Sequence, residues 1–136
     1  MPMADELKVL VERLKAVSHP LRLRVLALLG SGELCVCQVA EVLQVPASSA
    51  SEALRELRRA GFVTERKEGR WVFVSVVAGI GESPLLKGIL DEALLLPEAG
   101  RDLARAGEVK AMPVPEVCAK VQGEASLERT ARGARR

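Results

Sequence analysis

Apolar residues recur at helical spacing along the first sixty positions of the chain. In Asp5–Val17 every third or fourth residue is apolar, which predicts a helix with one apolar stripe. A second, more buried helix is expected over Leu21–Leu29, and a short third helix over Glu33–Leu43. Pro46 disfavours helical geometry just before it, so a tight break should separate the third helix from a fourth over Ser48–Ala60.

The period then changes to that of strands. Two runs rich in β-branched and aromatic residues, Phe62–Lys67 and Arg70–Val77, are separated only by Glu68-Gly69, which predicts a hairpin. Pairing across this turn would place Lys67 opposite Arg70, so the tip of the hairpin should be charged and its base apolar.

The remaining chain divides into one more helix and an extension. A helix is expected to start near Ser83-Pro84 and to carry apolar residues as far as Ala93. From Gly107 the pattern fades, and "MPVPEV" indicates an extended spacer. We therefore predict a domain at residues 1–106 and a poorly ordered, Pro-containing extension at residues 107–136, which carries Cys118.

This order of elements predicts a mainly α fold with a small β-hairpin (α+β), in the arrangement of a winged helix-turn-helix. The 136 residues are enough for one domain with a core. No apolar run is long enough to span a membrane, and the acidic N-terminus does not look like a secretion signal, so we expect a cytoplasmic protein without a membrane partner.

In such a fold the second helix of the pair and the hairpin would contact double-stranded DNA. The net charge of +2 is too small to argue for DNA alone, so the argument rests on where the polar residues lie. Hydroxyls and arginines suit phosphates and base edges. The candidate DNA-binding residues are Ser48, Ser49, Ser51, Glu52, Arg55, Arg59, Arg66, Lys67 and Arg70.

The candidate chemistry lies in three cysteines. Cys35 and Cys37 are two residues apart, and on a regular helix such positions do not face each other, so both could hold one ion only if the first turn were loose. The alternative is that both are small buried hydrophobic residues. A cysteine-dependent enzyme has little support, because the single histidine, His19, precedes Pro20 and is expected to cap or pack a helix end.

Four segments in this order and spacing resemble the ArsR/SmtB family of bacterial metal-responsive repressors: "HPLRLRVLALL", "GELCVCQVAEVLQV", "SSASEALRELRRAGFV" and "RKEGRWVFVSV". The resemblance implies a homodimer that binds an inverted-repeat operator and dissociates when an inducer binds. It also implies a dimer interface between the first and last helices, here Leu7, Leu10, Leu14, Leu86, Ile89 and Leu90. Ala47, Glu52 and Ala53 depart from the recognition helix of many members, so the operator sequence cannot be inferred from relatives.

In this family "ELCVC" resembles the thiolate site for As(III) or Sb(III), with Cys35 and Cys37 as ligands and no organic cofactor. Soft thiolates select soft ions. The third sulfur could come from Cys118, although this residue could equally be a bystander. The cadmium/lead form of the site adds a cysteine before Cys35, and this chain has none there. A redox- or persulfide-sensing repressor of the same fold is the alternative, and it would need Cys118 as a disulfide partner.

Overall fold

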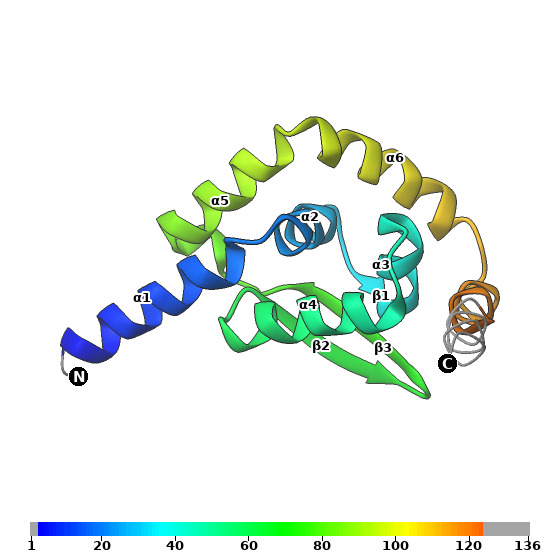
Figure 1. Cartoon of the computed structure of the whole chain (residues 1–136), viewed down its shortest axis with the longest axis horizontal. Coiled ribbons are helices and arrows are strands. Elements are labelled where there is room, and N and C mark those ends of the chain that lie inside the picture. Colours follow the sequence, from blue (N-terminus) through cyan, green and yellow to red (C-terminus); the bar gives the residue numbers. More distant parts are fainter. Residues whose placement is uncertain (1–2, 124–136) are drawn as a thin grey trace, which may run out of the picture.

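The computed structural model, which describes residues 3–123, contains the predicted helices and hairpin in the predicted order and adds a helix, α6 at Pro97–Lys110, that the sequence did not predict (Figure 1). No helix within these residues is both long and apolar enough to cross a membrane. The mainly helical α+β class is confirmed. The helices are α1 Met3–Val17, α2 Pro20–Leu29, α3 Val36–Leu43, α4 Ala47–Arg59, α5 Pro84–Leu94 and α6 Pro97–Lys110, with a 3₁₀ helix at Ile80–Glu82; the strands are β1 Leu34–Cys35, β2 Val63–Glu68 and β3 Trp71–Val76.

Local signals in the sequence begin two of these helices. The Nδ1 atom of His19 accepts a hydrogen bond from the backbone N–H of Leu21 at 3.2 Å, so His19 caps α2 as expected. The hydroxyl of Ser83 caps α5 in the same way, and each cap is followed by a proline in the first turn. Proline is favourable there because its missing N–H has no partner within the helix.

The prediction of a helix over Glu33–Leu43 is wrong for its first turn, because the helix begins at Val36. Leu34 and Cys35 form the short strand β1, which pairs antiparallel with Val74 and Phe73 of β3. The sheet therefore has three strands in the order β1-β3-β2. The turn before α3 is thus part of the sheet that forms the wing, and no unwinding of a helix is needed to separate Cys35 from Cys37.

The hairpin is confirmed, but its register differs from the expected one. Glu68 pairs with Trp71, and the turn consists of Gly69 and Arg70 rather than Glu68-Gly69. Gly69 has a φ of 62°, a conformation that glycine adopts without steric cost, and glycine at the first central position suits a type II′ turn. The shift places Arg66 opposite Phe73, and the Arg66 guanidinium lies 4.6 Å from the centre of that ring.

One apolar core joins the helix pair α3–α4 to α2 and the hairpin. Its largest fully buried side chains include Leu26, Val39, Leu57 and Phe62. In α4 the buried residues are Ala50, Ala53, Leu54 and Leu57, and the opposite side of the helix is exposed. The core therefore fixes one face of α4 and leaves the other available to a partner.

The C-terminal part of the described chain is more ordered than the sequence predicted. α5 and α6 form an arch over α2, and the chain then returns toward α3 (Figure 1). Only residues 111–113 are non-helical before a helical segment at 114–123, which we call the C-terminal segment. Val117, Cys118 and Val121 are buried, so this part is neither an extended spacer nor poorly ordered. The domain boundary at 106/107 stays a prediction, and the rest of the extension lies outside the described residues.

α1 projects from the body of the protein (Figure 1). It leaves several large apolar side chains exposed: Leu7, Val9, Leu10, Val11 and Leu14. Of the residues expected at a dimer interface, Leu7, Leu10 and Leu14 are exposed, and Ile89 and Leu90 are half-buried. The expectation for Leu86 is not supported, because its side chain is 4% exposed and belongs to the core of its own chain.

Candidate functional site

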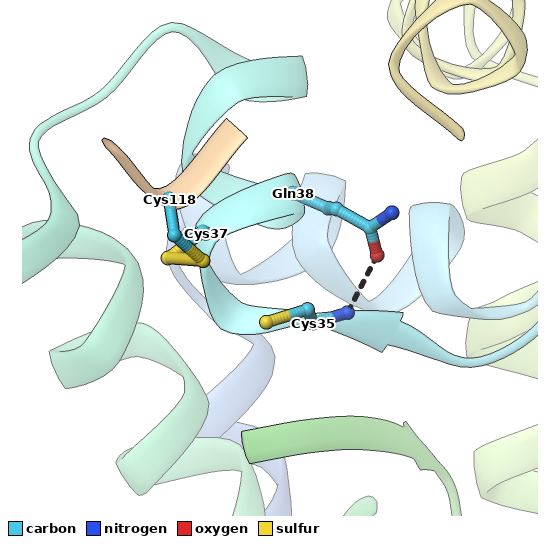
Figure 2. Close-up of a disulfide and its surroundings, with 4 residues drawn as sticks. All are labelled: Cys35, Cys37, Gln38 and Cys118. Carbon is cyan, nitrogen blue, oxygen red and sulfur yellow. Dashed lines mark hydrogen bonds between the residues drawn. A yellow bond between two sulfur atoms is a disulfide. The ribbon is translucent and has the colours of Figure 1, made fainter. Parts of the chain in front are cut away.

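Three cysteines from distant parts of the sequence meet beside the start of α3 (Figure 2). The Sγ atoms of Cys35, Cys37 and Cys118 all lie within 4.8 Å of one another. Cys37 and Cys118 are joined by a disulfide, with their Cα atoms 5.1 Å apart and a sequence separation of 81. Cys35 is buried and unpaired. The structure thus brings together the three cysteines that the sequence singled out.

Each cysteine belongs to a different element. Cys35 ends β1 and is also the residue that precedes α3, where its backbone N–H donates a hydrogen bond to Gln38 Oε1 at 2.8 Å (Figure 2). Cys37 lies in the first turn of α3, and Cys118 lies in the C-terminal segment. Two side chains that are two residues apart on a regular helix do not face each other. Cys35 has extended backbone geometry and lies outside α3, so this restriction does not apply to Cys35 and Cys37.

A groove of about 520 Å³ connects the thiols to the helix and hairpin that the sequence assigned to DNA. Cys35 and Cys37 line one part of it. The residues that line the rest include Ser51 and Arg55 of α4, Trp71 of β3 and Gln122 of the C-terminal segment. A ligand held by these thiols would therefore lie next to side chains of both α4 and the hairpin.

The candidate DNA-binding residues lie at the surface of α4 and the hairpin. Eight of the nine are exposed, and Ser49 is half-buried. Arg59 forms an ion pair with Glu56 at 3.4 Å, and the guanidinium of Arg70 lies 5.4 Å from the centre of the Trp71 ring. These contacts leave a surface with several arginines and hydroxyls, the groups that contact phosphates and base edges.

Arg66 differs from the other candidates because two carboxylates already occupy its guanidinium. It donates hydrogen bonds to Glu33 at 2.7–3.1 Å and to Glu68 at 2.8 Å. The hydrogen bonds from Arg66 lower the pKa of Glu33, and those to Glu33 and Glu68 raise the pKa of Arg66. Arg66 is therefore partly neutralised at the surface where a phosphate would bind.

Sequence reasoning missed three residues of this region: Glu33, Glu41 and Gln122. Glu33 and Gln122 join the site through tertiary contacts, with Arg66 and the groove respectively, and no local pattern indicated them. Glu41 carried a signal, since it is an acidic residue within the apolar helical run that ends at Leu43. A buried carboxylate in such a run needs a cationic partner.

The helix pair α3–α4, followed by the β2–β3 hairpin, defines a winged helix-turn-helix, a class of DNA-binding regulator. Comparisons with known proteins agree with this class. Residues 19–65 match the family model described as "Bacterial regulatory protein, arsR family". The arsenic resistance transcriptional regulator ArsR1 of Pseudomonas putida is 33% identical over 105 residues, which cover 74% of this chain and 81% of that protein.

Solved structures with the same fold include reduced HlyU from Vibrio cholerae, with 30% identity and a TM-score of 0.56 over 68% of this chain and 92% of that one. A homodimeric winged helix-turn-helix DNA-binding domain from Mycobacterium bovis has 27% identity and a TM-score of 0.59. The match covers 66% of this chain and 82% of that domain. The protein belongs to the ArsR family and is a winged helix-turn-helix transcriptional repressor of the ArsR/SmtB type.

Proposed function

We propose that this repressor, once a cellular thiol such as glutathione has reduced the Cys37–Cys118 disulfide to two thiols, dissociates from its operator when As(III) or Sb(III) is bound by Cys35, Cys37 and Cys118. The observation that carries the proposal is the meeting of the three sulfur atoms within 4.8 Å of one another, although one of them comes from a remote segment. Thiolates are soft ligands and favour soft ions. The similarity to the P. putida arsenic resistance regulator supports the same class of inducer.

The thiols lie on elements that directly contact the hairpin and α4, so binding of an ion to them could change the placement of both DNA-binding elements. Cys35 belongs to β1, which is hydrogen-bonded to β3 of the hairpin, whereas Cys37 belongs to α3, which packs against α4. If the two sulfurs move toward a common ligand, β1 and α3 must shift relative to each other. The hairpin and α4 would then lose the relative placement that operator binding requires.

We propose that the repressor binds its operator, an inverted repeat, as a homodimer. The large apolar side chains exposed on α1 support such an interface, since a contiguous apolar surface of this kind commonly marks an interaction site. Two copies related by a twofold axis would present two α4 helices and two hairpins to the two half-sites.

The disulfide favours a second candidate function, a thiol-based redox sensor of the same fold. Oxidation of the Cys37 and Cys118 thiols to a disulfide releases two electrons and two protons to a cellular oxidant such as a peroxide or a disulfide. The C-terminal segment would then be linked covalently to the start of α3. A persulfide sensor would use the same pair. In either case Cys35 would not be required.

The experiment that separates these functions is operator release, followed by fluorescence anisotropy of a labelled duplex. Reduced protein is titrated with arsenite, antimonite, Cd(II), Zn(II) and hydrogen peroxide in parallel. We expect arsenite or antimonite to release the wild type, and Cys35→Ser and Cys37→Ser to remain bound to DNA. Serine is nearly isosteric and favourable before a helix, so the Cys35→Ser protein should fold.

Val36→Ala, between the two cysteines, controls for a general weakening of this turn and should respond to arsenite as the wild type does. Release of Cys35→Ser at the wild-type arsenite concentration would exclude the metalloid proposal. Release of wild type and Cys35→Ser by peroxide, but not of Cys118→Ser, would instead identify a redox sensor.

A further inference from the structure

α3 contains a buried carboxylate, Glu41, in addition to Cys37. The side chain of Glu41 is only 2% exposed, on the same helix as Cys37 and one turn further along. Glu41 Oε1 accepts hydrogen bonds from Lys120 Nζ at 2.7 Å and from an Arg105 guanidinium nitrogen at 3.2 Å. The backbone carbonyl of Glu41 accepts a further hydrogen bond from Arg105 Nε at 3.2 Å.

Both cations of this cluster come from the C-terminal part of the protein. Arg105 lies in α6, and Lys120 lies in the C-terminal segment two residues after Cys118. A buried carboxylate is costly without its partners. Within the described residues Glu41 Oε2 has no hydrogen-bond partner, so Oε1 carries the contacts with both cations. Lys120 reaches Oε1 only when the C-terminal segment is docked on α3, which is also the arrangement that places Cys118 beside Cys37.

We propose that Glu41 is a positioning residue for the third sulfur: through Lys120 it holds Cys118 at the thiol site. This inference rests on the proposed function for its consequence in sensing, but the positioning itself can be measured without a metalloid. Val117 and Val121 already bury the apolar side of the segment. The ion pair adds a directional contact, which apolar packing does not supply, and so fixes the register of the segment along α3.

A positioning role predicts that three-sulfur binding depends on the ion pair, whereas two-sulfur binding does not. The test uses Lys120→Gln, because Lys120 is half-exposed and its loss should leave the fold intact. Lys120→Arg keeps the charge and should restore binding. Lys110→Gln makes the same change of charge at an exposed position at the end of α6 and is the matched control.

Binding of arsenite and of phenylarsine oxide to the reduced proteins is measured by isothermal titration calorimetry. Phenylarsine oxide has one organic substituent and takes only two thiolates. For Lys120→Gln we expect a loss of arsenite affinity of roughly tenfold, the size expected for one charge-assisted hydrogen bond on a half-exposed lysine. Phenylarsine oxide is compared in the Cys118→Ser background, where it can take only Cys35 and Cys37. There Lys120→Gln should change its affinity by less than about twofold, since no contact to Cys35 or Cys37 is removed.

The second measurement is the equilibrium of the Cys37–Cys118 pair with glutathione. Two protein thiols and one oxidised glutathione give one protein disulfide and two reduced glutathione molecules, to which the two thiol hydrogens pass. Lys120→Gln should shift this equilibrium toward the dithiol by a similar factor, whereas Lys110→Gln should not shift it.

Equal losses for arsenite and phenylarsine oxide would overturn the proposal, since they would indicate a general structural defect. Wild-type behaviour of Lys120→Gln in both measurements would overturn it as well. If arsenite fails to release the wild-type repressor from DNA, the proposed function fails, and the glutathione equilibrium still decides whether Glu41 and Lys120 position Cys118.

Discussion

Arg66 in β2 binds Glu33, the residue immediately before β1, through hydrogen bonds to both carboxylate oxygens. This contact links β2, the outer strand of the hairpin, to the segment that carries Cys35. The pairing of β1 with β3 is a second link between the hairpin and this segment. The hairpin and the thiol site are therefore one connected unit.

The Glu33–Arg66 ion pair should reduce the affinity of the hairpin for DNA. Glu33→Gln removes one of the two carboxylates that compete for Arg66 and leaves Glu68, so Arg66 becomes more available to a phosphate. We expect roughly threefold tighter binding to any duplex at low salt, and a steeper dependence of binding on salt. Anisotropy titrations at several salt concentrations measure both quantities. Glu82→Gln, an exposed acid outside the hairpin, is the control, and equal behaviour of the two variants would contradict the prediction.

Arg55 should contribute to sequence recognition. Its side chain is exposed on α4 and lines the groove beside the hairpin. Arg55→Ala is expected to weaken operator binding by about 1–3 kcal/mol while changing nonspecific binding much less. Competition between operator and scrambled duplexes measures the difference. Arg101→Ala makes the same change of charge on α6, and a matching loss in that variant would show that only net charge matters.

The exposed leucines of α1 should hold the dimer together. Leu10→Glu places a carboxylate on the apolar stripe, where dimer formation would have to bury it. We expect a monomer that binds the operator much more weakly than wild type. Lys8→Gln, an exposed position on the same helix with the same change of charge, should remain dimeric. Sedimentation velocity distinguishes the two states, and a dimeric Leu10→Glu protein would exclude α1 as the interface.

Oxidation should stabilise the protein against heat. A bond between Cys37 and Cys118 closes a loop across a separation of 81 residues. The loss of denatured-state entropy for a loop of this size corresponds to about 4.5 kcal/mol. The melting temperature of the oxidised protein should therefore exceed that of the reduced protein by on the order of 10 °C. Calorimetry of Cys118→Ser should show no such difference, and a difference in that variant would contradict this origin.

Local periodicity was sufficient to predict α1, α2, α4, α5 and the hairpin, because each has an apolar face or alternation that neighbouring residues define. β1 was missed because a two-residue strand exists only through its pairing with Phe73 and Val74. The register of the hairpin was missed because it depends on the geometry of one turn at Gly69.

The candidate site was predicted as a set of residues but not as an arrangement. The sequence identified Cys35, Cys37 and Cys118, whereas the order of the C-terminal segment was not visible. Its docking rests on buried Val117 and Val121 and on the contact of Lys120 with Glu41, and these are tertiary interactions without a local signature. Cys35 has extended backbone geometry because it pairs in the sheet, and this geometry allows its side chain to lie near Cys37. The sheet pairing is likewise a tertiary interaction.

The long separation between Cys37 and Cys118 also has a consequence in time, while the chain is being synthesised. Ribosomes add about 5–20 residues per second, so Cys118 follows Cys37 by roughly 4 to 16 s. α4 and the hairpin are synthesised within this interval, before the third sulfur. A nascent repressor would therefore acquire its DNA-reading elements before it acquires a complete thiol site, and a prematurely ended chain would keep the first property without the second.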